Sequence, residues 1–202
     1  MNALFKVESI VIETERLILR KWELSDLDDF FEYASTPGVG EMAGWEHHKT
    51  KEDTLNVLKD FIEEDKTFAI VYKENNKVIG SIGVEFYSSS DKLTEFNDYF
   101  GRELGFVLSK DYWNKGLMTE AIKALIDYLF NKLNYDFLLC GYFSKNVQSK
   151  KVQEKCGFKP YRKLTFKTRF NTQEEGVLNL LLNPEKDIKL IFTNTKTLIY
   201  EK

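Results

Sequence analysis

The feature that most constrains this chain is a long amphipathic helix predicted between two apolar strands. Residues 117–133 carry leucine or alanine at every fourth position, with charged residues off that stripe, so one broad face of the helix must be buried. A strand is predicted before it, at 102–108, and the continuous apolar run 137–143 predicts a strand buried on both faces after it. This order is typical of a βαβ unit, which places two parallel strands in one sheet.

The remaining elements predict antiparallel strands around this unit. Two strands joined by an Asn-containing turn at 73–77 have the pattern of a hairpin. Further strands are predicted at 16–20, 68–72, 78–86, 158–166 and 177–182, and further helices near 25–36, 51–64 and 147–156. We therefore expect a mixed α/β fold, with a mostly antiparallel sheet of about seven strands flanked by about four helices.

Local signals mark the ends and faces of these helices. Ser25 and Asp28 have the spacing of a capping box at the start of the first helix. Gly157 follows the helix near 147–156 and is its natural C-cap. The second helix is predicted to turn four apolar residues inward: Leu55, Leu58, Phe61 and Ile62.

Composition indicates one slightly acidic domain. With 202 residues and 43% hydrophobic content, the chain can fill a single core. The formal net charge of −3 argues against a nucleic-acid partner, which usually requires a basic surface. We assign residues 1–183 to the domain and residues 184–202 to a C-terminal extension. In that extension, 188–192 and 197–200 form either an added hairpin or an interface segment.

Targeting and cysteine patterns predict a cytoplasmic protein without a metal. The first twelve residues mix Lys6 and Glu8 into a short apolar stretch and lack a signal-peptide cleavage pattern. No apolar run approaches the roughly 20 residues needed to cross a bilayer, so we expect no membrane partner. Cys140 and Cys156 are too few for a disulfide framework and lack metal-like spacing, which favours buried thiols.

The segment 112–119 carries the clearest chemical signal, because it connects a predicted strand to the long helix. The amino end of a helix exposes unpaired N–H groups and the positive end of its dipole, which together suit a pyrophosphate. Gly116 would let a phosphate come close, and Lys115 would add local positive charge. An ordinary turn remains the alternative interpretation of this segment alone.

Gly105 adds a second signal. A glycine inside an apolar strand is unfavourable unless the strand bulges or another backbone-like group comes close. The two amides of a pantetheine arm are such a group, and they would pair with the free edge of the strand as a neighbouring strand would. A bulge without any ligand is the alternative.

Further motifs make a family resemblance specific. Asn146-Val-Gln-Ser149 and Glu154-Lys-Cys-Gly-Phe158 follow the buried strand, and Thr14-Glu-Arg-Leu-Ile-Leu-Arg20 opens the chain. With the loop at 112–118, they resemble the Gcn5-related N-acetyltransferase (GNAT) superfamily, and in particular its branch of RimJ/RimL-type ribosomal-protein N-acetyltransferases. The resemblance covers about residues 14–183. It implies an acyltransferase that uses acetyl-coenzyme A (acetyl-CoA) as co-substrate.

The same resemblance implies which residues hold the coenzyme. The family loop reads Gln/Arg-x-x-Gly-x-Gly/Ala, and this chain keeps the central Gly116 but has Trp113 and Met118 at the two ends. Because backbone N–H groups bind the phosphates, the site should survive these departures. The coenzyme-binding residues implied in this way are Phe106, Val107, Leu108, Trp113, Asn114, Lys115, Gly116, Leu117, Met118, Thr119, Asn146 and Ser149.

Acetyl transfer to an amine needs a base for the amine and a proton for the departing thiolate. The tyrosine that often protonates the thiolate in the family is replaced here by Gln153, so the resemblance favours Ser149 as the acid. A hydroxyl that faces solvent or bonds its own helix is the alternative. Glu103 is the predicted base, and a surface carboxylate paired with Arg102 or Lys110 is the alternative there.

The acceptor side is predicted from two loops, 36–49 and 87–101. Their carboxylates would make a mildly acidic mouth that suits a cationic amine: Glu41, Glu46, Asp91, Glu95 and Asp98. His47 and His48 titrate in a useful range, but their charged neighbours favour a solvated edge of that mouth.

Three functions follow from these residues. The leading hypothesis is acetylation of a protein or peptide N-terminal α-amine, and its nearest rival is acetylation of a small amine such as a polyamine, an amino acid or an antibiotic. The missing tyrosine leaves a non-catalytic coenzyme A-binding module as a third. A nucleotide-binding protein is disfavoured because neither a G-x-G-x-x-G nor a P-loop pattern is present. The sequence leaves open whether the protein forms a homodimer.

Overall fold

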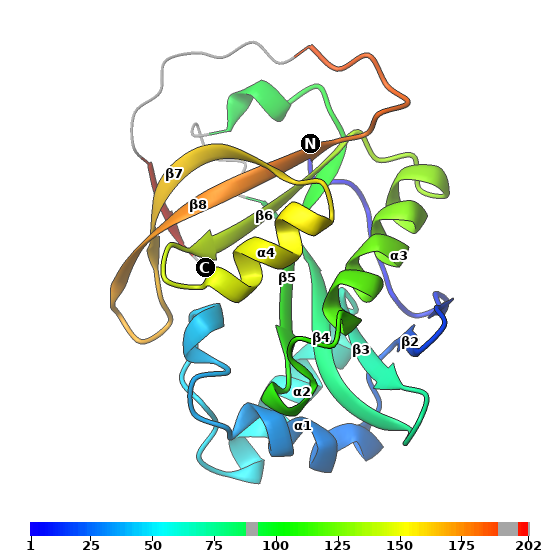
Figure 1. Cartoon of the computed structure of the whole chain (residues 1–202), viewed down its shortest axis with the longest axis vertical. Helices are drawn as coiled ribbons and strands as arrows, with labels where there is room; N and C mark the ends of the chain where they lie inside the picture. Colours follow the sequence, from blue (N-terminus) through cyan, green and yellow to red (C-terminus); the bar gives the residue numbers. More distant parts are fainter. Residues whose placement is uncertain (88–92, 190–197, 202) are drawn as a thin grey trace.

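The computed structural model describes residues 1–87, 93–189 and 198–201, and these form a mixed sheet with helices on both faces (Figure 1). The strands are β1 (Ile12–Glu13), β2 (Leu17–Arg20), β3 (Thr67–Tyr72), β4 (Lys77–Glu85), β5 (Gly101–Leu108), β6 (Phe137–Phe143), β7 (Lys159–Lys167), β8 (Gln173–Leu182) and β9 (Leu198–Glu201), and the helices are α1 (Leu27–Ala34), α2 (Lys51–Glu64), α3 (Leu117–Asn131) and α4 (Val147–Lys155). The predicted fold class is confirmed. The described sheet has nine strands rather than about seven, because β1 and β9 add to its edges.

The strand order is β1-β2-β3-β4-β5-β6-β8-β7-β9. Neighbours run antiparallel except for β5 with β6 and β7 with β9, so the predicted βαβ unit of β5, α3 and β6 lies at the centre of the sheet. The apolar stripe of α3 packs into the main core, where Leu117, Ala121, Leu125 and Leu129 are each at most 1% exposed. The regular spacing of this stripe is what fixes α3 against the sheet.

Helices α1 and α2 cover the opposite face of β3 and β4, in a smaller core around Trp22 and Phe30. Two local predictions fail here. Asp26, rather than Asp28, accepts the capping hydrogen bond, from the Glu23 N–H at 2.9 Å, because a short 3₁₀ turn precedes α1. Ile62 is 39% exposed, since α2 turns Thr54 and Leu58 toward the sheet and Ile62 away from it.

The two central parallel strands separate, and this opening positions the site. Pairing between β5 and β6 is limited to residues 101–103 and 137–139. Beyond that point the two strands diverge (Figure 1), so within the described chain the β6-facing edge of β5 is unpaired from Leu104 onward. The pairing of β5 with β4 continues without a register shift to Leu108. The predicted alternative of a bulge at Gly105 is therefore wrong.

The two ends of the chain pack differently. Near the N-terminus, apolar side chains such as Phe5 and Val7 join the main core, and Asn2 forms a parallel bridge with Gly101. In the C-terminal extension, β9 pairs in parallel with β7. The first arm of the predicted hairpin, 188–192, lies partly outside the described residues. No helix in the described part of the chain is long and apolar enough to cross a membrane.

Candidate active site

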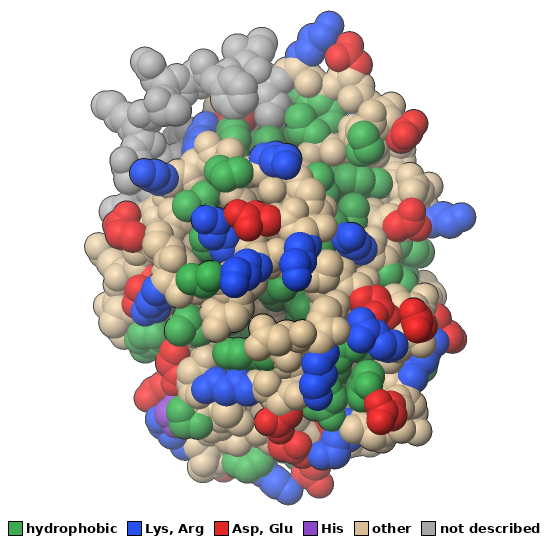
Figure 2. Space-filling view, viewed as in Figure 1, with side chains coloured by type: hydrophobic (Ala, Val, Ile, Leu, Met, Phe, Trp, Pro, Cys, Tyr) green, Lys and Arg blue, Asp and Glu red, His purple; other side chains and the backbone are tan. Residues whose placement is uncertain are grey.

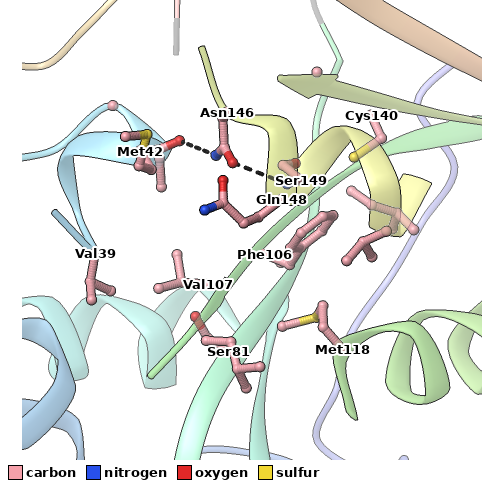
Figure 3. Close-up of a pocket in the computed structure, with 18 of the residues that line it drawn as sticks. Val39, Met42, Ser81, Phe106, Val107, Met118, Cys140, Asn146, Gln148 and Ser149 are labelled. Atoms are coloured by element: carbon pink, nitrogen blue, oxygen red, sulfur yellow. Dashed lines mark hydrogen bonds between the residues drawn. The ribbon is translucent and has the colours of Figure 1, made fainter. Parts of the chain in front are cut away.

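A cavity of about 1270 Å³ occupies the opening between β5 and β6. Figure 3 shows Phe106 and Val107 from β5 facing the same space as Asn146 and Ser149 at the start of α4. The wall is built by the separated strands, by the amino ends of α3 and α4, and by the segment between α1 and α2. We call the part of the cavity at α3, where the coenzyme is predicted to bind, the coenzyme end, and the part at α1 and α2 the acceptor end.

The amino end of α3 has the backbone form that an anion site needs. Asn114 and Gly116 both adopt the left-handed conformation, with φ of 61° and 78°, and no side chain caps the helix at Gly116. Gly116 is required by this conformation rather than by crowding, since an added Cβ would meet only Arg16 Nη2, at 3.7 Å. The first N–H groups of α3 thus stay available beside the cavity.

Three side chains hold this loop in place. Trp113 Nε1 donates to the Leu108 carbonyl at 2.8 Å, which ties the loop to the end of β5. Arg16 on the segment leading into β2 donates to the Lys115 carbonyl at 3.0 Å. Its guanidinium also contacts Glu120 in the first turn of α3, with Nη2 to Oε2 at 2.6 Å. Glu120 lies off the apolar stripe of α3, and the sequence pattern did not predict this anchoring role.

The environment of Glu120 keeps it ionised. Burial alone would favour the neutral acid, but hydrogen bonds from the Thr14 hydroxyl at 2.6 Å and the Arg16 backbone N–H at 2.9 Å outweigh it. These contacts hold the pKa of the Glu120 carboxyl below its usual value. A negative side chain in the first turn also suits the helix dipole.

Positive charge reaches the coenzyme end from α4. Lys115, predicted to supply it, does not line the cavity, and its ammonium lies 5.0 Å from the centre of the Tyr112 ring. Lys151 and Lys155 on α4 do line the cavity. Figure 2 shows Lys and Arg side chains gathered over α4, beside a hollow in this face. The pair was missed because a lysine-rich helix face usually means only solvent contact.

Asn146 and Ser149 form one hydrogen-bonded unit at the start of α4 (Figure 3). Asn146 Oδ1 accepts from the Ser149 N–H at 3.0 Å, and Asn146 Nδ2 donates to the Met42 carbonyl at 3.0 Å. Gln153, at the position of the family tyrosine, is 1% exposed. Its Nε2 donates to Ser149 Oγ at 3.1 Å, while its Oε1 accepts from Asn179 at 2.9 Å. The Ser149 oxygen is thus used as an acceptor, which leaves its proton to be donated elsewhere.

Gly105 and Glu103 lie at the floor of the cavity, on β5. A Cβ added at Gly105 would meet nothing within 4 Å, so the space in front of it is open. Glu103 is buried but still lines the cavity. Arg102 and Lys110, the alternative partners of Glu103 in the sequence analysis, form other hydrogen bonds. Arg102 Nε donates to the Ala3 carbonyl at 2.7 Å, and Lys110 Nζ donates to the Pro37 carbonyl.

The acceptor end differs from the predicted acidic mouth. Glu41 contacts His47, with Oε1 to Nδ1 at 2.7 Å, and Glu46 contacts Lys49 at 2.9 Å. Glu95 is held by Tyr161 and Arg162. Asp91 lies outside the described residues. None of the other four predicted carboxylates lines the cavity, and Glu85 and Glu103 line it instead.

His48 is part of this acceptor end rather than a solvated edge. It lines the cavity, lies 5.0 Å from Trp45 between ring centres, and shares a hydrogen bond between Nδ1 and Thr54 Oγ1 at 2.8 Å. Burial lowers the pKa of its imidazole below the usual value. The wall here also includes the aromatic rings of Phe30 and Phe61 and the polar or charged side chains of Thr67, Ser81 and Arg169.

The predicted coenzyme-binding residues are thus brought together. All of them except Lys115 line the cavity, and the Leu108 carbonyl is already occupied by Trp113. No metal-binding group of His, Cys, Asp or Glu is found among the described residues. Both cysteines are buried, as predicted, and burial raises the pKa of the Cys156 thiol to about 11.

An unpaired strand edge and the amino end of a helix, open to one cavity, fit a transferase that binds an acyl thioester of coenzyme A. Residues 16–159 match the family model described as an acetyltransferase (GNAT) domain. The chain therefore belongs to the GNAT family, and it is an acetyl-CoA-dependent N-acetyltransferase.

Individual relatives agree with this assignment. The chain is 31% identical to the uncharacterized N-acetyltransferase p20 of Bacillus licheniformis over 72% of this chain and 80% of that protein. A GNAT-family acetyltransferase from Bacillus anthracis has a similar structure, with a TM-score of 0.72 and 25% identity over 86% of this chain and 99% of its own. The ribosomal-protein-S5-alanine acetyltransferase of Vibrio fischeri has the same fold, with a TM-score of 0.64 and 22% identity over 90% and 100% of the two chains.

Proposed function

We propose that this protein transfers the acetyl group of acetyl-CoA to the N-terminal α-amine of a protein or peptide. The observation that carries the proposal is a cavity that joins the amino end of α3 to the unpaired edge of β5. The pyrophosphate would lie at Gly116 and the N–H groups that follow it, and the pantetheine arm along β5. Lys151 and Lys155 would add charge for the phosphates.

Acetyl-CoA supplies a thioester whose carbonyl carbon the amine attacks and whose thiolate departs. Ser149 would protonate that thiolate, and the hydrogen bond that its oxygen accepts from Gln153 supports this role because it leaves the hydroxyl proton available. Glu103, on the cavity floor before the strands separate, would accept the amine proton directly or through water. Burial lowers the pKa of His48, which favours the neutral ring near pH 7. A neutral ring does not add a positive charge that would repel a cationic acceptor.

The fold shared with a ribosomal-protein-S5-alanine acetyltransferase supports a peptide acceptor. The size of the cavity supports it as well, since a coenzyme arm and a chain end must both be held. A small amine is the second candidate, favoured by the two carboxylates that line the acceptor end.

Release of free thiol from acetyl-CoA tests the proposal. Purified protein would be supplied with peptides that vary in their first residue, with the same peptides blocked at the α-amine, and with small amines. We expect release with the free peptides and none with the blocked ones. Release with small amines alone would overturn the peptide acceptor. Acetyl-CoA binding without release from any amine would overturn the catalytic role of the site.

A further inference from the structure

The floor of the acceptor end is a row of small residues next to two carboxylates. Thr67 on β3 pairs with Gly83 on β4, and Gly83 pairs with Gly105 on β5. Two residues farther along the same face, Glu85 pairs with Glu103. All five residues line the cavity. Strand register therefore places an open space directly beside a pair of carboxylates.

Glu85 extends over this floor. A Cβ added at Gly83 would collide with Glu85 Oε1, so the glycine is what allows the carboxylate to lie there. Oε2 contacts Lys66 Nζ at 2.8 Å, and the same ammonium contacts Glu64 at 3.1 Å. The Lys66 ammonium is thus shared between two carboxylates. Glu103 lies directly across the strand pair from Glu85, where Cβ atoms are about 5 Å apart, so two carboxylates stand side by side at this floor.

Thr67 provides an independent sign of a ligand. Thr67 as a whole residue is 4% exposed, and its Oγ1 has no hydrogen-bond partner in the described part of the chain. Buried hydroxyl groups almost always have a partner. Because Thr67 lines the cavity next to the floor at Gly83, a ligand with N–H donors would satisfy the hydroxyl and the Glu85 carboxylate together.

We infer that Glu85, with Thr67, binds a second cationic nitrogen of the acceptor beside the amine that is acetylated. The inference rests on the proposed function and narrows its substrate class to acceptors with two positively charged nitrogens. A short α,ω-diamine has this chemistry, and so does a peptide whose first residue is lysine. A free amino acid would bring its carboxylate toward Glu85 and Glu103, and is a poor acceptor for that reason.

Thiol-release kinetics with matched acceptors test the preference. Diaminobutane is compared with butylamine, and a Lys-first peptide with a norleucine-first peptide, which separates the small-molecule source from the peptide source. We expect wild-type kcat/KM to favour the dicationic member of the pair by at least about 10-fold, the range of one charge-assisted hydrogen bond. Glu85→Gln should reduce that ratio to about 1. Gly83→Ala, which displaces the carboxylate without removing it, should change the ratio in the same direction.

Glu64→Gln is the matched control. It removes the other carboxylate that contacts Lys66 but does not line the cavity, so the ratio should stay within about twofold of wild type. A ratio near 1 in the wild-type protein, or an unchanged ratio in Glu85→Gln, overturns the inference while acetylation itself stands.

A binding measurement tests the second nitrogen site without requiring turnover. With coenzyme A present, diaminobutane should raise the melting temperature of the wild-type protein more than butylamine does, and Glu85→Gln should remove the difference. Loss of thiol release from every amine, with this difference intact, would overturn the proposed function and not the second nitrogen site. Equal shifts for the two amines in the wild-type protein would overturn the site.

Discussion

The Ser149 hydroxyl offers the sharpest test of the proposed chemistry, because its surroundings predict separate effects on catalysis and stability. Ser149→Ala removes one neutral hydrogen bond, from Gln153 Nε2 at 3.1 Å, worth about 0.5–1.5 kcal/mol. The capping bond from the Ser149 N–H to Asn146 is a backbone donor and stays. For a chain of this size the melting temperature should fall by only about 1–6 °C.

The catalytic effect should be much larger. A positioned general acid contributes about 10²–10⁴ in rate, so kcat of Ser149→Ala should fall at least about 100-fold, a barrier increase of about 2.7 kcal/mol. The affinity for acetyl-CoA, measured by calorimetry, should change less than about twofold, since we expect backbone N–H groups to carry most of that binding. Ser144→Ala, an exposed serine away from the cavity, is the matched control and should be neutral.

Gln153 allows a second check of the same idea. Gln153→Met should lower kcat because it removes the donor that orients Ser149, and it should cost more stability because Asn179 loses its acceptor. In a Ser149→Ala background, Gln153→Met should have little further effect on kcat, because the two act through one hydroxyl. A Ser149→Ala enzyme within about threefold of wild-type kcat, or additive losses in the double variant, would refute this reasoning.

Three further predictions concern stability and the coenzyme loop. Gly116→Ala forces alanine to φ of 78° without a clash, which costs about 1–2 kcal/mol. It should raise the Kd for acetyl-CoA in a calorimetric titration. Glu120→Gln loses a partly exposed ion pair with Arg16, worth about 1 kcal/mol. Because the pKa of Glu120 is lowered in the folded protein, the unfolded chain gains this proton first as the pH falls below about 4.5, and Glu120→Gln should flatten that loss of stability. The lowered pKa of His48 means that the unfolded chain binds its proton first, so stability should fall as pH drops through about 6.5, and a pH series of urea melts should lose that slope in His48→Gln.

The coenzyme end was predictable because its signals are local. The stripe of α3, the glycine before it and the apolar run of β6 are each contained in a few consecutive residues, and they determine a strand, a turn and a helix directly. Glu120 escaped prediction because its partners at Thr14 and Arg16 are distant in sequence. Ile62 was misplaced because a helix stripe does not reveal how wide the covered face is.

The acceptor end was not predictable from local pattern because strand register creates it. Thr67, Glu85 and Glu103 belong to three strands, and only the pairing of those strands brings them to one floor. One signal was nevertheless present: β4 reads Gly-Ser-Ile-Gly-Val-Glu at 80–85, with Ser81 and Gly83 on one face and apolar Ile82 and Val84 on the other. A strand with small side chains on one face cannot fill the space in front of it. In a close-packed protein such a space is maintained at a cost in stability, so we interpret the small residues as the mark of a ligand.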